Sequence, residues 1–549
     1  MRANQLFMAA IVCSTAFDVV SPALAEHHGH IDFRPIGGIG NNLVHPDFDA
    51  VPGAAELALT PLNFIGNNNG LVDGPNPRLI SNFIAGGTAA DGENGQTTDP
   101  VGSAWLYVFG QFVDHDLDLE DASPTSAPIN ITVFPGDPTF PQGTSIAMNR
   151  DVRSPATNTI VNTVAGYLDL SQLYGSTVEV AMGLRNPDGS LKSSFNGQAL
   201  PIVGGSFVTG DARVMENPEL TALTTLFMRE HNQWVGVLKS QFPESTGDQR
   251  YETARAMTTA EYQNIVYQEY LPILIGPVLG AYSGYDADVN AQVTQEFSTA
   301  AFRLGHSQVS DTQEGIDNNG NVTFTESLAQ AFFNTPAQDM ANGINPLLHA
   351  IGVDYSQATD VYVVSALRNL LFAPLASGGL DLVDLIAIDI QRERDVGLGT
   401  LNQTRQAMGC DAYQSFTQLT QDPVLQHHLK AIYGTIDKVD LFIGGLAEDH
   451  ASGAMVGPTF QTIIARQFHA LRAGDRFFWQ NQGFDQATAS MISQTTLAMI
   501  IQRNTDITNL QANVFIEAPA GMPRVASHVP SRVVSSQERR THPFMSDGW

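Results

Sequence analysis

The stretch FGQFVDHDLDLE, residues 109–120, places one histidine between two aspartates in an otherwise apolar segment. Its apolar residues recur at helical spacing, which predicts a buried helix over 105–119. In such a helix the side chain of Asp116 points about 100° away from that of His115, so Asp114 and Asp116 face different neighbours. A lone histidine in such a helix is usually an ordinary core residue. Buried carboxylates are costly unless they are hydrogen-bonded or metal-bound, so the two flanking acids weaken that interpretation.

Net charge excludes some classes of partner. The 549 residues include 27 basic and 56 acidic side chains, a formal net charge of −29. Such a chain repels nucleic acid and anionic membrane surfaces. Beyond the N-terminus no apolar run reaches the roughly 18 residues that a membrane helix needs. We therefore expect no nucleic-acid partner and no membrane span.

The N-terminus has the pattern of a secretory signal peptide over residues 1–25. One basic residue precedes an apolar run, and Ala23-Leu24-Ala25 forms a small-residue cleavage site. Asp18, directly after the apolar run, leaves a short N-terminal core helix as the alternative. The pattern predicts a secreted or periplasmic protein.

The cysteine content of the chain bears on the expected export. Cys13 and Cys410 are the two cysteines of the chain, and cleavage would remove the first. We expect no disulfide within the fold and no disulfide-linked oligomer. An exported protein without disulfides is more typical of bacteria than of animals.

Helical periodicity dominates the chain from about residue 101 onward, and few strands are evident. Short hairpins are expected near 186–198 and 317–326, where turn residues separate short runs. The clearest helical segments are 102–119, 218–241, 253–275, 297–310, 359–388, 425–432 and 456–473.

No repeat or low-complexity linker divides the chain into separate domains. Residues 26–100 are rich in Gly, Asn, Pro and Asp, which favours a loop-rich arm. Residues 101–510 form the expected helical body. Residues 511–549 lack periodicity, and we expect a mobile tail there. The prediction is a mainly α protein with one large helical domain and little β-structure.

A second cluster of polar residues lies at 210–234. Arg213 and Glu216 are three residues apart, directly before Asn217 and Pro218. Asparagine followed by proline is typical of a helix N-cap and first turn, so a helix should begin here. By itself the Arg–Glu pair would indicate no more than a surface ion pair beside a helix start.

Two further segments carry isolated polar side chains. STAAFRLGHSQVSD (298–311) sets Arg303 and His306 on one face of an apolar helix, and QRERDVGLGTLNQTR (391–405) contains Asn402. Each signal is weak alone. Together, two helix-borne histidines far apart in sequence, an isolated arginine and amide partners are what a site for haem and peroxide needs.

These four segments resemble the signatures of the animal-type haem peroxidase superfamily, the peroxidase–cyclooxygenase group. The resemblance covers about residues 31–510 and implies the single, mainly α haem-peroxidase domain of that family. Four more blocks match in the same order: NPRLISN (76–82), LDLSQLYGS (168–176), YGTIDKVDLFIGGLAED (433–449) and VGPTFQTIIARQFHALRAGDRFFWQN (456–481).

The resemblance implies an enzyme that reduces hydrogen peroxide and, through an oxoferryl intermediate, oxidises a halide, thiocyanate or small organic donor. His115 matches the distal histidine, which takes a proton from peroxide and later returns it. Arg213 matches the distal arginine, whose charge stabilises the departing oxygen. Gln111 matches a glutamine that helps hold water and the anion. Such activity would suit a response to oxidative stress.

The resemblance also implies how haem b is held. His306 matches the proximal iron ligand, and Asn402 matches the asparagine that accepts a hydrogen bond from the other ring nitrogen of that histidine. Arg303 is expected near a haem propionate. Asp114 and Glu216 match two carboxylates that form ester links to haem methyl groups.

A calcium site is implied as well. Asp116, Asp169 and Ser171 match ligands of the family, and the backbone carbonyls of Ala165 and Tyr167 complete the shell. Ala165 departs from the family pattern, in which a threonine adds a hydroxyl ligand. That departure leaves the number of ligands and the affinity open.

Two other functions are compatible with the fold. A fatty-acid dioxygenase of this fold needs a tyrosine three residues before the proximal histidine, and the residue there is Arg303. A non-enzymatic adhesion module would need no catalytic residues, whereas all of them are present here. The chain also lacks Arg-Gly-Asp, since residues 474–476 read Gly-Asp-Arg.

Overall fold

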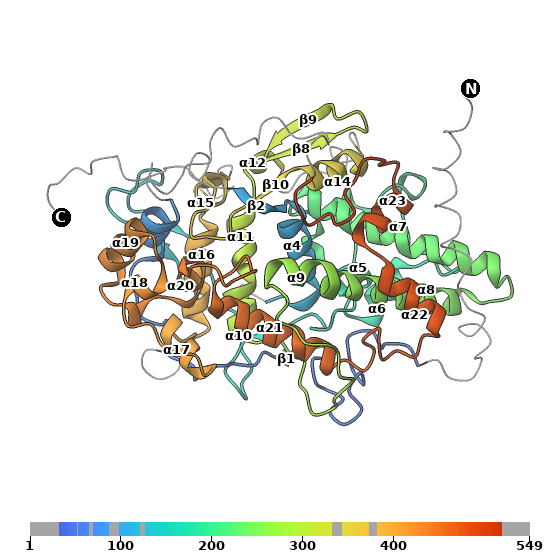
Figure 1. Ribbon diagram of the computed structural model, residues 1–549, viewed down its shortest axis with the longest axis horizontal. Coiled ribbons are helices and arrows are strands. Elements are labelled where there is room, and N and C mark those ends of the chain that lie inside the picture. The colour runs from blue at the N-terminus through green and yellow to red at the C-terminus, as the bar shows by residue number, and fades with distance from the viewer. Residues whose placement is uncertain are drawn as a thin grey trace, which may run out of the picture.

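The helix predicted around His115 is α4 (Trp105–Leu117), and it lies in the middle of the molecule (Figure 1). A computed structural model describes residues 32–51, 53–64, 70–86, 98–120, 127–331, 343–372 and 381–518. The expected signal peptide and most of the expected tail lie outside the described residues, and both stay predictions of the sequence.

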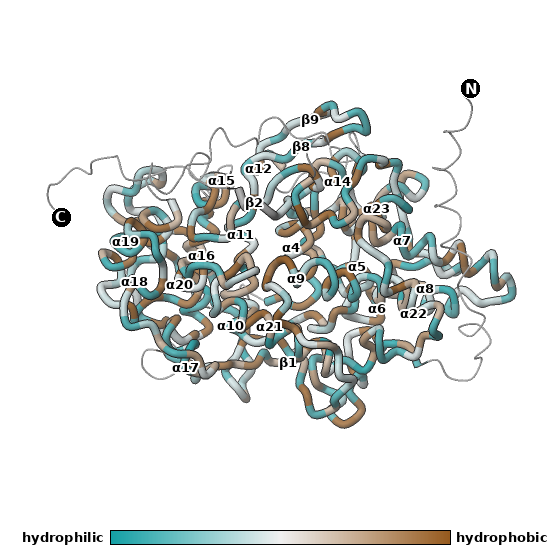
Figure 2. The backbone as a smooth tube through the Cα atoms, in the orientation of Figure 1, coloured by the Kyte–Doolittle hydropathy of each residue, from teal (hydrophilic) through white to brown (hydrophobic). Residues whose placement is uncertain are grey.

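Helix α4 is buried because its apolar side chains point in every direction except toward one polar strip. Figure 2 shows apolar stretches gathered around it. Gly110 allows close packing, because a Cβ at this position would lie 2.8 Å from the hydroxyl of Tyr270. The α4 side chains with no exposed surface are Trp105, Leu106, Phe109, Phe112, Val113, Asp116 and Leu117.

Two long helices pack beside α4. Helix α7 (Pro218–Gln241) begins where the sequence predicts, and the side chain of Asn217 caps it by accepting the N–H of Leu220 at 2.8 Å. Helix α8 (Gly247–Ile265) continues through a π-helical turn, η4 (Val266–Tyr270), into α9 (Leu271–Leu274). The rings of Phe112 and Phe227 stack at 5.0 Å and join α4 to α7.

The segment that carries His306 is broken, whereas the sequence predicts one helix over 297–310. It consists of α10 (Gln295–Ser298), the 3₁₀ turn η5 (Ala301–Leu304) and α11 (Gly305–Gln308). The break has a backbone cause, since Ala300 adopts φ −137° and ψ −70° between the two pieces.

Most of the described residues of 359–388 do not form the helix predicted there. The chain there forms the short helix α15 (Ser365–Arg368) and strands β11 (Leu370–Phe372) and β12 (Asp381–Val383). A regular helix, α16 (Leu385–Asp395), begins only at the end of the predicted segment. Closely spaced β-branched residues such as Val361, Val363 and Val364 favour extended chain, and periodicity alone does not reveal this.

Strands are short and occur in antiparallel pairs. Strands β8 (Thr312–Ile316) and β9 (Val322–Ser327) form the hairpin predicted near 317–326. The hairpin predicted near 186–198 is reduced to isolated bridges. The other pairs are β1 (Ala54–Ala55) with β5 (Val161–Asn162), β2 (Thr98–Ser103) with β10 (Tyr355–Gln357), β3 (Ile131–Thr132) with β4 (Ser145–Ile146), β6 (Ile202–Val203) with β7 (Ser206–Phe207), and β11 with β12.

The other helices surround this centre, with α16 to α20 on one side of α4 and α7, α8 and α22 on the other (Figure 1). Their bounds are α2 (Pro77–Ile80), η1 (Ser81–Ala85), α5 (Ser171–Tyr174), α6 (Val178–Leu184), η2 (Phe195–Gly197), η3 (Ala212–Met215), α12 (Leu328–Ala331), α14 (Ile344–Val353), α17 (Leu401–Ala407), α18 (Phe416–Leu419), α19 (Pro423–Tyr433), η6 (Ile436–Lys438), α20 (Leu441–Ala447), α21 (Pro458–Ala473), α22 (Gln486–Gln494) and α23 (Leu497–Asn504).

One main cluster of buried apolar side chains extends in sequence from Ile80 to Phe515. The N-terminal arm docks on it from residue 32 onward, where Arg34 and Asn41 both bond the carboxylate of Asp475, at 2.5 and 2.9 Å. Within the described ranges, none of the helices combines the length and the apolar character that a bilayer crossing would require.

Candidate active site

A cavity of about 450 Å³ lies between α4, the turn before α7, and the η5–α11 segment. This volume falls within the range of roughly 300–1,000 Å³ that is usual for cofactor and ligand sites. The cavity brings together seven residues that the sequence analysis singles out: Gln111, Asp114, His115, Arg213, Glu216, Arg303 and His306.

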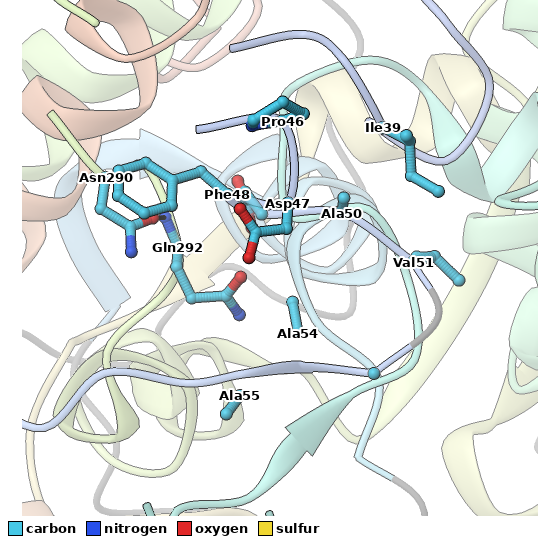
Figure 3. Close-up of a pocket in the computed structure, with 12 residues that line it drawn as sticks. Ile39, Pro46, Asp47, Phe48, Ala50, Val51, Ala54, Ala55, Asn290 and Gln292 are labelled. Atoms are coloured by element: carbon cyan, nitrogen blue, oxygen red, sulfur yellow. Dashed lines mark hydrogen bonds between the residues drawn. The ribbon is translucent and has the colours of Figure 1, made fainter. Parts of the chain in front are cut away.

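A second cavity, of about 500 Å³, lies elsewhere in the fold. It is lined by the N-terminal arm, with Asp47 and Phe48, and by the loop before α10, with Asn290 and Gln292 (Figure 3). None of the predicted site residues lines it. The cavity between the two histidines is therefore the candidate active site.

His115 lies in the wall of the candidate active site with only 5% of its surface exposed. Burial lowers the pKa of its ring to about 3, and the charge of Arg213 acts in the same direction. The imidazole is therefore neutral near pH 7 and can accept a proton. Its Nε2 lies 3.7 Å from Oε2 of Glu216, which faces the same cavity.

Arg213 is fixed in place by a neighbour that the sequence analysis missed. Its Nε donates to both carboxylate oxygens of Asp211, at 3.0 and 3.1 Å, and Nη2 donates to one of them at 2.6 Å. Nη2 also donates to the backbone carbonyl of Asp118 at 2.9 Å, which joins the turn η3 to the end of α4. Burial opposes the charge of Arg213, but Asp211 raises the pKa of the guanidinium above its ordinary value.

Gln111 lies one helical turn from His115 and is bonded through both ends of its amide. Nε2 donates to Oε2 of Glu216 at 3.0 Å, and Oε1 accepts from Nδ2 of Asn217 at 2.9 Å. Asn217 is also the cap of α7, so the start of that helix sets the orientation of the Gln111 amide.

Burial raises the pKa of two carboxyl groups that line the cavity. Burial raises the pKa of Asp114, although Arg213, Arg303 and His306 oppose the shift. Burial also raises the pKa of Glu216, against the charge of Arg213. An ester carries no charge, so this environment suits the covalent role that the sequence analysis expects for both residues.

The expected partner of His306 is wrong. Its Nδ1 lies 2.6 Å from Oδ2 of Asp389 on α16, and no hydrogen bond joins it to Asn402. Asn402 instead donates to Asp437 at 2.7 Å and exchanges hydrogen bonds with the backbone of Tyr413. Asn402 lies in the first turn of a separate helix, α17, and the turn of chain after α16 carries it away from His306.

Arg303 links the His306–Asp389 pair to a further acid, Glu120. Its Nη1 donates to Oδ1 of Asp389 at 3.0 Å, and its Nη2 donates to Glu120 at 3.0 Å. Its Nε donates to the carbonyl of Ser298 at 2.9 Å. A guanidinium has five N–H donors, so two remain for another acceptor. The propionate contact expected for Arg303 stays a prediction.

The loop predicted to bind calcium closes around Asp116. Oδ2 of Asp116 accepts the backbone N–H groups of Asp169 and Leu170, at 2.9 and 3.0 Å. Oδ1 accepts the N–H and the hydroxyl of Ser171, at 2.5 and 2.8 Å. Leu170 has φ +61°, a left-handed conformation that turns successive N–H groups toward one anion. Ala165 and Tyr167, whose backbone carbonyls are expected to complete the shell, are also buried.

Comparison with known proteins is consistent with this geometry, since the sequence profile of the family described as animal haem peroxidase matches residues 33–515. The chain belongs to the animal haem peroxidase family. Family membership identifies it as a haem-dependent peroxidase, which transfers electrons from a reductant to hydrogen peroxide.

Three relatives illustrate the range of the family. Peroxinectin A of Dictyostelium discoideum is 31% identical over 91% of this chain and 98% of its own length. Human eosinophil peroxidase is 31% identical over 77% of this chain and 67% of its own length. The human peroxidasin homolog is 30% identical over 88% of this chain, which spans only 37% of that protein.

Solved structures show the same fold. Peroxidase A from Dictyostelium discoideum superposes with a TM-score of 0.78 at 30% identity, covering 88% of this chain and 99% of that one. The fatty acid α-dioxygenase of Arabidopsis thaliana superposes with a TM-score of 0.76 at 18% identity, covering 92% of this chain and 86% of that one. The second likeness concerns the fold alone.

The cavity fits the haem of this family. His306 is anchored through Nδ1, and no hydrogen bond among the described residues occupies its Nε2. His115 lines the same cavity, as do Asp114 and Glu216, whose carboxyl pKa values burial raises.

Three side chains that hold this site were not predicted from the sequence: Asp211, Glu120 and Asp389. Asp389 had the clearest signal, because it is the one acid within the apolar run LIAIDI of residues 385–390. The same contrast singled out His115. Asp211 lies two residues before Arg213. Acidic and basic residues two positions apart are common in sequences, so this pair gives no specific signal.

Proposed function

We propose that this peroxidase carries out its reaction in the cavity between His115 and His306, and that its electron donor is a halide, thiocyanate or small organic molecule. The observation that carries the assignment is the buried imidazole of His115 in the same cavity as Arg213, whose guanidinium Asp211 holds in place. Haem bound through His306 would supply the iron that binds peroxide and stores the oxidising equivalents.

His115 acts first as a base. A neutral imidazole would take a proton from one oxygen of hydrogen peroxide and return it to the other as the O–O bond breaks. Arg213, held by Asp211, places a positive charge where negative charge develops on the departing oxygen. Gln111 presents an oriented amide one turn away and helps hold water or the donor.

A stopped-flow experiment tests these assignments. The haem-loaded protein is mixed with peroxide and then, in separate runs, with chloride, bromide, iodide, thiocyanate or a phenol. We expect His115→Ala to keep its Soret absorption but to react with peroxide roughly 10²–10⁴ times more slowly. His306→Ala should lose haem. His427→Ala, at an exposed position on α19, is the control. A peroxide rate in His115→Ala equal to that of the wild type would disprove the role.

The donors that restore the ferric spectrum in the second mixing step identify the class of reductant. Two-electron oxidation of an anion returns the ferric spectrum in one step, whereas a phenol returns it in two. The dioxygenase alternative has no support from the site, because Arg303 occupies the position of the required tyrosine and is bonded to Asp389.

We further propose that Asp114 and Glu216 are esterified to the haem. The support is their shared cavity and the burial that raises the pKa of both carboxyl groups. Acid–organic extraction tests the proposal: haem should stay with the protein. Asp114→Asn together with Glu216→Gln should release it, and complete release of unmodified haem from the wild type would disprove the links.

We also propose a calcium ion beside Asp116 and Asp169. Burial raises the pKa of both carboxyl groups, that of Asp169 to about 6, and Asp169 contributes to the rise at Asp116. Oδ1 of Asp169 is buried and has no hydrogen-bond partner among the described residues. Because Asp116 already accepts four hydrogen bonds, we expect chelation to lower the melting temperature without unfolding the protein. Metal analysis that finds no calcium in the purified protein would refute the site.

A further inference from the structure

We propose that Asp389 is a positioning residue that gives His306 part of the character of an imidazolate and thereby stabilises the ferric state of the haem iron. The inference rests on the proposed binding of haem through His306. It concerns a carboxylate on α16 for which the sequence motifs predict no role.

The hydrogen bond between His306 and Asp389 is short, and the Asp389 side chain is fully buried. Oδ2 of Asp389 lies 2.6 Å from Nδ1 of His306, and the Asp389 side chain has no exposed surface. Charge-assisted hydrogen bonds of this type normally measure about 2.7–2.9 Å, so this is a strong one. It also selects the tautomer with the proton on Nδ1, which leaves the lone pair of Nε2 for a metal.

The carboxylate cannot rotate away from His306. Its other oxygen, Oδ1, accepts a hydrogen bond from Nη1 of Arg303 at 3.0 Å. Arg303 is in turn held by Glu120 and by the carbonyl of Ser298. Each oxygen of Asp389 thus has its own donor, and the bond to His306 keeps its direction.

The charge of the group that accepts the hydrogen bond from His306 determines the effect on the reduction potential. An amide oxygen would also accept this hydrogen bond, but it carries no net charge. A carboxylate draws the Nδ1 proton toward itself and makes the ring a more basic ligand. Ferric iron carries one more positive charge than ferrous iron, so an anionic ligand environment stabilises it more and lowers the reduction potential. Arg303 moderates this effect because it shares the charge of Asp389.

The test compares the haem-loaded wild type with Asp389→Asn, which replaces the carboxylate by an amide of the same shape. Spectroelectrochemistry gives the potential of the ferric–ferrous couple. Resonance Raman spectroscopy of the ferrous protein gives the iron–histidine stretching frequency, which a purely structural role would not change. We expect the potential to rise and the frequency to fall. A tenfold change in the relative stability of the two oxidation states corresponds to about 59 mV.

The matched control is Asp395→Asn, in the same helix. Asp395 is also buried, but it bonds Arg150, Arg153 and Arg392 and does not contact His306. Asp395→Asn should leave the iron–histidine stretching frequency unchanged. If Asp389→Asn retains the potential and the frequency of the wild type, the inference is wrong although the haem site stands.

A second variant covers the case in which Asp389→Asn does not keep its haem. Arg303→Gln removes the counter-charge and leaves the carboxylate, so the iron–histidine frequency should rise above that of the wild type. An unchanged or lower frequency overturns the inference. A wild-type protein that takes up no haem at all would instead refute the proposed function.

Discussion

Oε1 of Gln111 accepts a hydrogen bond from Nδ2 of Asn217 at 2.9 Å, while Oδ1 of Asn217 accepts the N–H of Leu220 and caps α7. One asparagine thus fixes both the start of a 24-residue helix and the amide of a residue in the candidate active site. Position 217 therefore links the fold to the site.

Asn217→Ser separates these two roles. Serine caps a helix about as well as asparagine, but its shorter side chain cannot reach Gln111. We expect a nearly unchanged melting temperature and a fall of up to roughly tenfold in the rate of donor oxidation, the cost of one neutral hydrogen bond. Asn217→Ala should in addition lose about 1 kcal/mol of stability. If Asn217→Ser oxidises every donor at the wild-type rate, the link to Gln111 has no functional importance.

Arg213→Gln tests the charge beside His115. The variant keeps a hydrogen-bond donor but removes the positive charge, so the reaction with peroxide should slow by roughly 10²–10³-fold. Stopped-flow absorbance in the Soret region measures this rate. Arg466→Gln, an exposed arginine of α21, is the control and should react like the wild type. A slowing shared by both variants would point to a general effect of net charge.

The pH dependence of the peroxide reaction tests the environment of His115. A histidine must be neutral to act as a base, and burial lowers the pKa of this one to about 3. Its neutral form therefore persists as the pH falls through 6.5, where an ordinary histidine gains a proton. We expect a rate that stays level from about pH 8 to about pH 5. A titration near pH 6.5 that disappears in His115→Ala would contradict the assignment.

Arg78→Met tests a buried ion pair that supports α16. Arg78 has no exposed surface and donates to Asp137 and Asp384, each at 2.7 Å. Asp384 caps α16, the helix that carries Asp389. Removing the arginine leaves a buried carboxylate unpaired, which should cost about 3–5 kcal/mol in the free energy of unfolding.

Chemical denaturation of the haem-loaded protein measures this loss. Arg185→Met is the matched control, because its partner Asp248 is mostly exposed and such surface pairs contribute about 0–1 kcal/mol. Similar losses of unfolding free energy in the two variants would show that the buried ion pairs of Arg78 stabilise the protein no more than a surface pair does.

The sequence by itself determined the elements whose signals are local. The apolar stripe of α4 with its polar interruption, and the Asn-Pro start of α7, need no distant partner to form. The spacing of the family motifs added His306 and Arg213, so one cavity could be expected to contain both histidines. Local signals were weaker where β-branched residues follow one another, and for that reason most of the described residues of 359–388 are not helical.

Only the tertiary structure decided which side chain supports His306. Asp389 and Asn402 lie 13 positions apart in the sequence, and both can accept a hydrogen bond from an imidazole. The choice depends on where the fold places α16 relative to the short helix α11, and on the turn that carries Asn402 toward Tyr413 and Asp437. A sequence records which groups are available, whereas a hydrogen bond of 2.6 Å between residues 83 positions apart requires that packing places them together.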